Sequence, residues 1–330
     1  MNKLKIFLMI LTCLFVSCAN KSTPDTENQT PSLPVVAAPD FNVDSAYLFV
    51  EKQVSFGPRV PNSPAHKACG DYLISELKRF GAQLHVQEMT LTAYNGDRLQ
   101  SRNIIGSYNI TSPKRILLFA HWDSRPYADE DADPVTQRMP IDGADDGASG
   151  VGVLLEIARR IGNQTPEWGI DIIFFDAEDY GTPTFDKGSY TLDSWCLGSQ
   201  FWAKNPHTPN YKATYGILLD MVGAKNATFF KEALSVRRAS FLVEKVWNTA
   251  RDLGYGKYFI QAKGGGVTDD HVYVIAGRNI PCIDIINYDT ENTHGFADYW
   301  HTHNDTMENI SRETLKAVGQ TVLEVIYQND

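Results

Sequence analysis

Three apolar runs of the sequence are each followed at once by acidic or imidazole side chains. The runs and the segments after them are 115–120 with His121-Trp122-Asp123, 170–175 with Asp176-Ala177-Glu178-Asp179, and 215–219 with Asp220. In open α/β sheets the carboxyl ends of the strands form the rim on which ligands bind. One such acid alone is explained more simply as a solvated turn residue. Several buried carboxylates at one edge need a cation to offset their charge, so the three together predict a cation site.

Two further segments carry side chains of the same kind. Residues 143–150 read GADDGASG and precede apolar residues at helical spacing. Asp145 and Asp146 are therefore expected at a helix N-terminus, where the helix dipole and free N–H groups keep a carboxylate ionised. Residues 299–306 read YWHTHNDT and supply His301 and His303 in a turn-like stretch. Neutral imidazoles with carboxylates are a typical zinc ligand set, and three protein ligands leave one position open for substrate.

The elements that must position these side chains alternate between strand and helix patterns. Strands are expected at 84–91, 103–108, 115–120, 170–175, 215–219 and 282–286, and helices at 66–80, 149–161, 240–253 and 312–327. Several strands are continuous apolar runs, which is typical of strands covered on both faces. The alternation predicts an α/β fold, in which residues 43–330 form a single domain with a central mixed, mostly parallel β-sheet flanked by helices.

The composition limits the possible partners. The chain has 330 residues, of which 43% are hydrophobic, and its 30 Lys and Arg against 40 Asp and Glu give a net charge of -10. This apolar content is typical of globular proteins and not of disordered ones. Because phosphate binding needs a cationic face, the acidic balance argues against nucleic acid as a partner.

The N-terminus has the plan of an export signal. Lys3 and Lys5 precede an apolar run to Val16, which is too short for a permanent membrane span, and the segment LFVSC ends at Cys18. This segment resembles the lipobox of bacterial lipoproteins, with Phe15 where Leu is usual. We expect a signal peptide at 1–17 and a lipidated, flexible tether at 18–42, rich in Pro, Ser and Thr. The protein would then be an exported bacterial lipoprotein, anchored to the inner or the outer membrane and facing the periplasm.

Three cysteines remain after signal removal and lipidation, namely Cys69, Cys196 and Cys282. An odd number allows at most one disulfide in an oxidising compartment, and the spacing does not say which pair would form it.

A set of short motifs resembles the zinc aminopeptidase superfamily. The motifs are HWDS at 121, GADDGASG at 143, FFDAED at 174, LLDMVG at 218, TDDH at 268 and WHTHNDT at 300. Within that superfamily the chain is more similar to the glutaminyl cyclases, which convert an N-terminal Gln to pyroglutamate and release ammonia. The features that favour them are Trp300 directly before His301, the DDH triplet at 269–271 and the GPRVPNS segment at 57–63.

The resemblance implies a zinc ion bound by Asp146, Asp179 and His301. Asp179 stands where the family generally has Glu. Asp220 falls where aminopeptidases place a ligand to a second metal, and His121 is the other possible ligand of that metal. One zinc ion is expected, and a second is left open.

The resemblance also implies how protons are moved and how the substrate is held. Glu178 would be the general acid/base, supported by a buried network of Asp220 and Asp269, with Asp270 as the alternative to Asp269. Trp300 would wall the pocket and select a compact side chain. The polar insertion at 180–196 is expected to edge the cleft. Trp195 and Trp202 could serve either the pocket or the core.

The remaining polar segments have plainer interpretations. Asp123 is expected to orient an imidazole or the backbone near the ligands. His303 is interpreted as a loop histidine beside the ligand. Residues 129–133 are expected to form a solvated loop at the rim, and the glycines at 264–266 a flexible approach to Asp269.

Three functions are compatible with these residues. The first is a glutaminyl cyclase with one zinc ion, acting as a monomer on peptides and proteins that begin with Gln. The second is a zinc aminopeptidase with two ions, in which Glu178 activates a water molecule. The third is a non-catalytic peptide-binding lipoprotein, which is the weakest because a full set of catalytic residues is expected.

Overall fold

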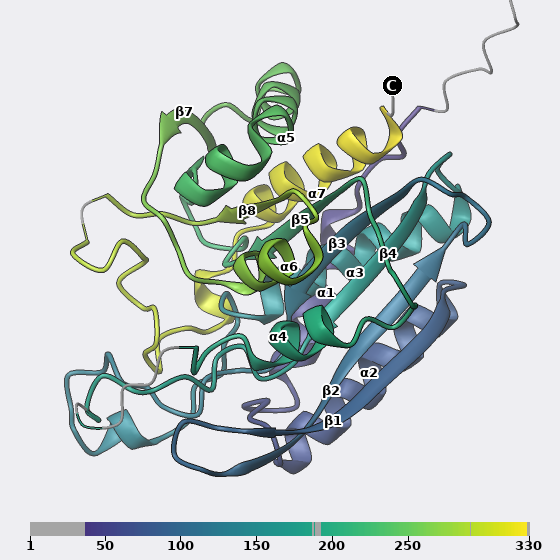
Figure 1. Cartoon of the computed structure of the whole chain (residues 1–330). Coiled ribbons are helices and arrows are strands. Elements are labelled where there is room, and N and C mark those ends of the chain that lie inside the picture. Colours follow the sequence, from purple (N-terminus) through teal and green to yellow (C-terminus); the bar gives the residue numbers. More distant parts are fainter. Residues whose placement is uncertain (1–36, 187, 189–192, 291, 329–330) are drawn as a thin grey trace, which may run out of the picture. The chain divides into compact units, whose positions relative to one another are not determined.

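A six-stranded mixed sheet is the centre of the fold (Figure 1). The computed structural model describes residues 37–186, 188, 193–290 and 292–328. The predicted signal peptide, Cys18 and the tether up to residue 36 lie outside these residues. The strands are β1 (Gln83–Thr92), β2 (Arg98–Tyr108), β3 (Arg115–His121), β4 (Gly169–Phe175), β5 (Tyr215–Asp220) and β8 (Cys282–Ile286).

The sheet has the order β1-β2-β4-β3-β5-β8. Strands β4, β3, β5 and β8 run parallel to one another, whereas β2 is antiparallel to both β1 and β4. The predicted mixed, mostly parallel sheet is therefore confirmed. A short parallel pair, β6 (Phe229–Lys231) and β7 (Phe259–Lys263), lies outside it.

The helices include four that the sequence predicts. These are α2 (Pro64–Arg79), α3 (Ala148–Asn163), α5 (Ala233–Asp252) and α7 (Arg312–Tyr327). Three more were not expected, α1 (Val43–Val54), α4 (Leu197–Lys204) and α6 (Asp270–Arg278), and two 3-10 turns occupy Thr136–Arg138 and Met307–Asn309. Helix α5 begins before the expected Ser240, because it continues through a non-helical residue, Ala239, with φ -146° and ψ 44°.

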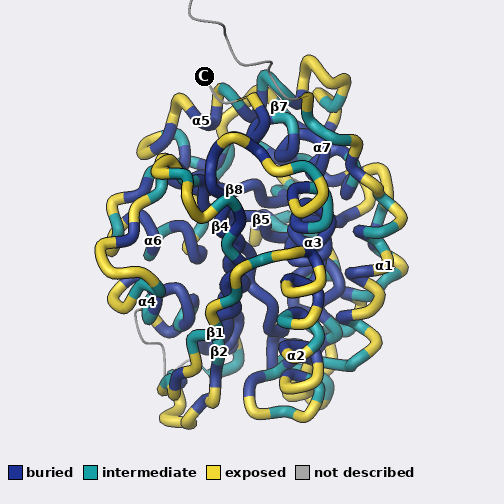
Figure 2. Tube along the Cα trace, turned by 90° about the vertical axis from the view of Figure 1, so that its right-hand side faces the viewer, coloured by how far each residue is buried: buried dark blue, intermediate teal, exposed yellow. Residues whose placement is uncertain are grey.

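Both faces of the sheet are covered, which explains the continuous apolar strands. Successive residues of β3 alternate between two cores: Ile116 and Leu118 belong to the larger one, and Leu117 and Phe119 to the smaller. Helices α1, α2, α3, α5 and α7 contribute to the larger core, and α4 and α6 to the smaller. Figure 2 shows α1, α2 and α3 on one side of the buried strands and α4 and α6 on the other. Within the described residues, no helix is both long and apolar enough to cross a membrane.

The last residues of the predicted tether pack on the domain. Phe41 is buried, and its backbone N–H donates a hydrogen bond to Gln320 Oε1 (2.8 Å). Its ring fills the space over Gly319 of α7, where an added Cβ would lie 2.2 Å from a ring carbon. The ordered domain therefore includes residues before the expected boundary at 43.

The three cysteines are free thiols and all are buried. No disulfide joins any two of them, and burial raises the pKa of Cys69 to about 12. The fold therefore does not depend on oxidation of these residues.

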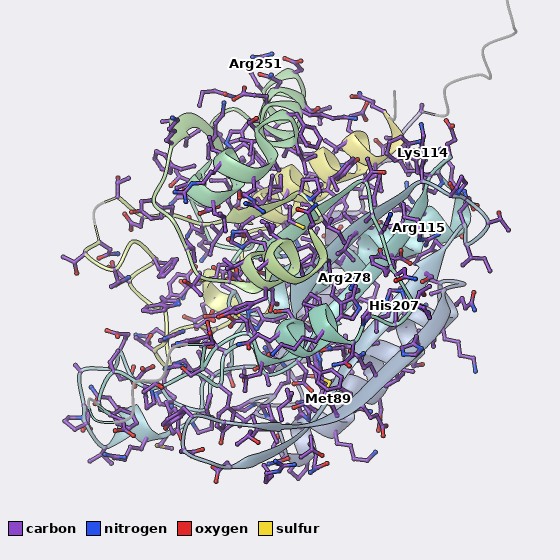
Figure 3. All side chains as sticks on the ribbon, viewed as in Figure 1. Met89, Lys114, Arg115, His207, Arg251 and Arg278 are labelled. Carbon is purple, nitrogen blue, oxygen red and sulfur yellow. The ribbon has the colours of Figure 1, made fainter. Side chains whose placement is uncertain are left out.

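The amino ends of the parallel strands lie at one end of the sheet, opposite the carboxyl ends that the predicted acidic residues follow. Here Arg115 binds Asp171 with two hydrogen bonds, from Nε (2.5 Å) and from Nη2 (2.7 Å). His207 lies at the same edge (Figure 3), where its Nδ1 accepts a hydrogen bond from the Trp202 indole (3.1 Å). His207 is therefore neutral in the fold, and burial lowers its pKa to about 4.

This neutral histidine predicts a loss of stability in mild acid. An unfolded histidine binds its proton at about pH 6.5, so stabilisation by neutral His207 is complete above that pH and declines as the pH falls toward 4. His207→Gln keeps an acceptor for Trp202 but does not titrate. Denaturant unfolding between pH 7 and pH 4 should show the wild type losing more stability than the variant. Parallel pH profiles of the two proteins would contradict this role of His207.

Candidate active site

The polar residues that follow the parallel strands meet at one edge of the sheet. Because β3, β4 and β5 are neighbours and run parallel, the segments after them reach the same place. A cavity of about 350 Å³ opens there. Its lining includes Asp146, Glu178, Asp179, Trp195, Asp220, Asp269, Trp300 and His301. The structure thus brings together the predicted zinc ligands, the predicted acid/base network and Trp300, with Trp195 beside them. His121, the possible ligand of a second metal, is not part of this lining.

The three predicted zinc ligands form a compact donor set. One ligand atom each from Asp146, Asp179 and His301 lies within 4.8 Å of the others, and all three residues are buried. His301 Nε2 is 3.3 Å from Asp179 Oδ1 and 3.6 Å from Asp146 Oδ2. The shorter Asp179 side chain therefore reaches the site even though Glu is usual at this position. Asp179 Oδ2 has no hydrogen-bond partner among the residues that the structure describes. Two carboxylates with one imidazole are a suitable zinc donor set, so these residues fit the metal.

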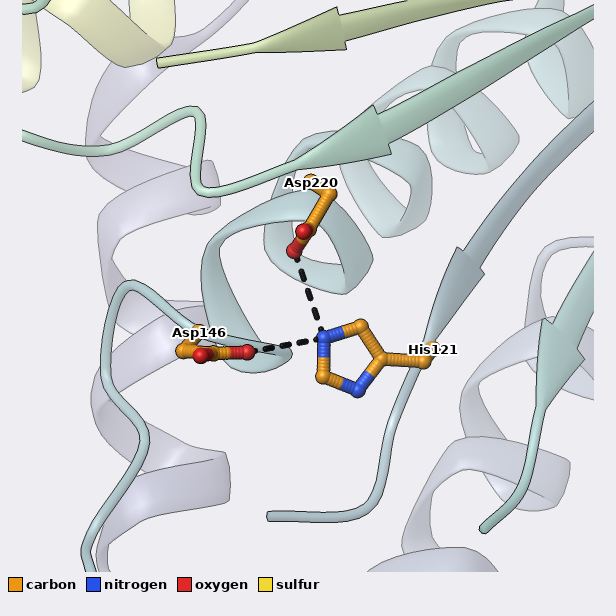
Figure 4. A group of neighbouring side chains, drawn as sticks. All are labelled: His121, Asp146 and Asp220. Atoms are coloured by element: carbon orange, nitrogen blue, oxygen red, sulfur yellow. Dashed lines mark hydrogen bonds and ion pairs between the residues drawn. The ribbon is translucent and has the colours of Figure 1, made fainter. Parts of the chain in front are cut away.

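A second donor set shares Asp146 with the first. Figure 4 shows His121 between Asp146 and Asp220, with Nε2 at 3.0 Å from Asp146 Oδ1 and 3.2 Å from Asp220 Oδ1. Burial alone would lower the pKa of His121, but the nearby carboxylates of Asp123, Asp146 and Asp220 raise it well above its ordinary value. The carboxyl ends of these strands therefore offer donors for one cation, or for two cations that would share Asp146.

Backbone hydrogen bonds fix the segment that carries Glu178 and Asp179. The Asp123 carboxylate accepts hydrogen bonds from the backbone N–H groups of Glu178 (3.1 Å) and Asp179 (3.2 Å). Asp123 Oδ1 also lies 3.5 Å from His121 Nδ1. Asp123 thus has the orienting position that the sequence predicts. Ala177, just before Glu178, has a positive φ of 53°, a strained conformation of the kind that occurs at functional sites.

Asp305 fixes the backbone of the GADDGASG segment, a role that the sequence did not predict. Its carboxylate accepts hydrogen bonds from the backbone N–H groups of Asp145 (2.8 Å) and Asp146 (3.0 Å). The only sequence feature that pointed to a role for Asp305 was its place in the WHTHNDT motif. Gly147 follows with φ 93°, and a Cβ there would lie 2.6 Å from the Asp123 carbonyl oxygen, so this turn requires glycine.

Glu178 is a buried carboxyl group surrounded by other acids. Burial raises the pKa of Glu178 well above its usual range, the charges of Asp269 and Asp179 add to this effect, and the charge of His121 opposes it. Cys196 contacts it, with Sγ 2.9 Å from Oε1. A carboxyl group whose pKa is raised is suited to act both as a proton acceptor and as a proton donor.

Asp269 is the member of the 269–270 pair that reaches the cavity. It lines the cavity, whereas Asp270 is fully buried in α6 and is not part of the lining. An oxygen of Asp269 lies within 4.8 Å of one of Glu178. Burial and the charge of Asp220 raise the pKa of Asp269 to about 7. This arrangement agrees with the predicted network of Glu178, Asp220 and Asp269, whose catalytic roles remain predictions.

Two tryptophan rings lie beside the predicted ligand His301. Trp300 stacks on its imidazole with ring centroids 3.6 Å apart, and Trp195 lies parallel to it at 5.9 Å. Trp195 therefore belongs to the pocket, whereas Trp202 is fully buried in the smaller core. His303 points elsewhere and pairs with Asp131 (2.5 Å), as expected for a loop histidine.

Comparisons with known proteins relate the chain to zinc-dependent enzymes. The sequence model of peptidase family M28 matches residues 103–326. A zinc-dependent exopeptidase from Parabacteroides distasonis is 71% identical, with a TM-score of 0.88 over 89% of this chain and 100% of the other. The glutaminyl cyclase of Tannerella forsythia is 64% identical, with a TM-score of 0.87 over 88% and 100%. Bovine glutaminyl-peptide cyclotransferase is 27% identical over 78% of this chain and 74% of its own length.

Proposed function

The chain belongs to peptidase family M28, and on this premise we propose that it is a zinc-dependent glutaminyl-peptide cyclotransferase. The observation that carries the proposal is its 64% identity to the Tannerella forsythia glutaminyl cyclase over that protein's whole length. The cavity supports it, because about 350 Å³ bounded by Trp300 and Trp195 suits a small N-terminal side chain. The substrates would be peptides and proteins that begin with Gln.

The residues of the cavity have the chemistry that this reaction needs. Zinc bound by Asp146, Asp179 and His301 would supply Lewis acidity toward the γ-carboxamide oxygen. Glu178 accepts a proton from the substrate's α-amine as the amine nitrogen forms a bond to the γ-carboxamide carbon. The carbon–nitrogen bond of the carboxamide then breaks, and Glu178 returns the proton to the leaving ammonia. Because nucleophile and electrophile belong to one residue, orientation by the pocket walls contributes much of the rate.

Aminopeptidase activity is the second candidate. It is favoured by the donor set of His121, Asp146 and Asp220, which could hold a second ion, and by the 71% identity to a zinc-dependent exopeptidase. We propose one zinc ion for the cyclase, whereas the peptidase would use two. The number of zinc ions per molecule of purified protein would therefore help to distinguish the cyclase from the aminopeptidase, as the activity assay does.

A substrate panel tests the proposal. The purified protein would be incubated with a Gln-peptide and with amino-acid anilides that carry varied N-terminal residues, and ammonia and released amine would be measured. A cyclase releases ammonia from the Gln-peptide and does not hydrolyse the anilides. Hydrolysis across the anilide series without ammonia release would favour the aminopeptidase and overturn the proposal.

We also propose that the protein is a monomer anchored to a membrane by lipid on Cys18. The support for the lipid anchor is the charged and apolar segment before Cys18 and the Pro-rich stretch after it. Cys18→Ala should move the protein from the membrane fraction to the soluble fraction and abolish incorporation of labelled fatty acid. A variant that is still labelled and membrane-bound would exclude Cys18 as the anchor.

A further inference from the structure

A buried ion pair lies behind the predicted zinc ligands. Arg125 and Asp129 are 0% and 2% exposed, and they form a bidentate pair with Nε–Oδ1 at 2.6 Å and Nη2–Oδ2 at 2.7 Å. The expectation that residues 129–133 form a solvated loop is thus wrong for Asp129. A buried ion pair must offset a large desolvation cost, so its other contacts indicate what it is used for.

Asp129 contacts the side of His301 that faces away from the other ligands. Its Oδ1 lies 3.4 Å from His301 Nδ1, while Nε2 of the same ring faces Asp146 and Asp179. The backbone N–H of Glu130 also donates to the His301 carbonyl oxygen (3.2 Å). A carboxylate on the second nitrogen of a metal-binding histidine fixes which nitrogen is free to bind the metal and how the ring is oriented.

Arg125 contacts a second ligand and the pocket wall. Its Nη1 donates to the Asp179 carbonyl oxygen (2.9 Å) and lies 3.5 Å from Asp179 Oδ1. Its guanidinium carbon lies 4.5 Å from the centroid of Trp195, the ring that is parallel to His301. Asp129 also accepts a hydrogen bond from the backbone N–H of Thr184 (2.8 Å), which ties Thr184 to the pair.

We propose that Arg125 and Asp129 are positioning residues that hold His301 and Asp179 in their metal-binding geometry and thereby set the affinity of the site for zinc. The inference rests on the proposed zinc site, but not on which substrate the enzyme uses. The pair contacts three residues that line the pocket, which are His301 from the C-terminal segment, Asp179 after β4, and Trp195.

The same sheet provides a matched control. Arg115 and Asp171 form another bidentate pair, with Asp171 buried, at the opposite edge. Asp171→Asn removes the same charge from the same kind of pair, far from the predicted ligands. Both Asp129→Asn and Asp171→Asn should lower the stability of the metal-free protein, because each removes the carboxylate that pairs with an arginine through two hydrogen bonds. Only Asp129→Asn should change zinc binding.

The experiment is a competition for Zn²⁺ between each protein and a chromophoric chelator, with thermal unfolding of the metal-free proteins measured alongside. We expect Asp129→Asn to weaken zinc binding about 10- to 100-fold, as is typical when such a partner is lost, and Asp171→Asn to leave it unchanged. Arg125→Lys keeps the positive charge but not the bidentate geometry, so it should weaken zinc binding by less than Asp129→Asn does. It replaces Asp129→Asn in the experiment if that variant does not fold.

Three results would overturn the inference. The first is zinc affinity equal to that of the wild type in Asp129→Asn, or in Arg125→Lys if Asp129→Asn does not fold. The second is a loss of zinc affinity in Asp171→Asn as large as that in Asp129→Asn. The third is that the wild type binds no zinc. Because zinc binding is measured without a substrate, failure of the cyclase proposal is detected separately, by the substrate panel.

Discussion

Glu178→Gln is expected to lower kcat roughly 10²- to 10⁴-fold, the usual contribution of a general acid or base, while zinc binding is retained. Glutamine has nearly the same shape, and its amide oxygen can still face the Cys196 thiol, but it cannot take the proton of the α-amine. Glu178 also lies outside the predicted zinc donor set of Asp146, Asp179 and His301. Steady-state kinetics on a Gln-peptide and a zinc assay on the same preparation would test this expectation.

Cys196→Ser is the matched control for that variant. Serine keeps a hydrogen-bond donor where the thiol lies 2.9 Å from Glu178 Oε1, so activity should stay close to that of the wild type. If Glu178→Gln retained both zinc and full turnover, Glu178 would not be the acid/base.

His301→Ala should produce the second large effect, loss of zinc and of activity together. The variant removes one of three predicted protein ligands, so we expect zinc affinity to fall by more than the roughly 10- to 100-fold that is typical of losing an orienting partner. Chelator competition and turnover at saturating substrate would measure the two losses.

His303→Ala is the corresponding control, two residues along the chain. His303 pairs with Asp131 and its side chain is 37% exposed, so its removal should leave both zinc affinity and turnover near wild type. If the two variants lost zinc equally, the assignment of His301 as the ligand would be wrong.

The sequence predicts those parts of the fold in which local pattern and tertiary environment agree. The apolar runs before His121, Asp176 and Asp220 are strands because both faces of the sheet are covered, and this requirement is visible in the residues themselves. Helices α4 and α6 span only 8 and 9 residues, too few for a clear apolar period. The start of α5 was missed because the expected helix corresponds to the part after the kink at Ala239.

The sequence likewise predicts the zinc ligands better than it predicts the residues that surround them. Asp146, Asp179 and His301 stand in motifs, so their types and spacing carry information. The burial of Asp129 depends on contacts to Arg125, four residues away, and to His301, 172 residues away, and no local pattern encodes the second of these.

The same argument applies to the tryptophans and the cysteines. Trp195 and Trp202 are the same residue type seven positions apart, and only packing sends one to the pocket and the other to the core. Cys69, Cys196 and Cys282 allowed one disulfide by count, but the fold buries each as a free thiol.

Cyclisation of an N-terminal glutamine in this cavity should consume no water. Incubating the zinc-loaded protein with a Gln-peptide in H₂¹⁸O, followed by mass spectrometry, tests this directly. We expect a peptide that has lost one ammonia and contains no ¹⁸O. Free glutamine carrying ¹⁸O in its carboxylate, released from a shortened peptide, would contradict this expectation and identify a hydrolase.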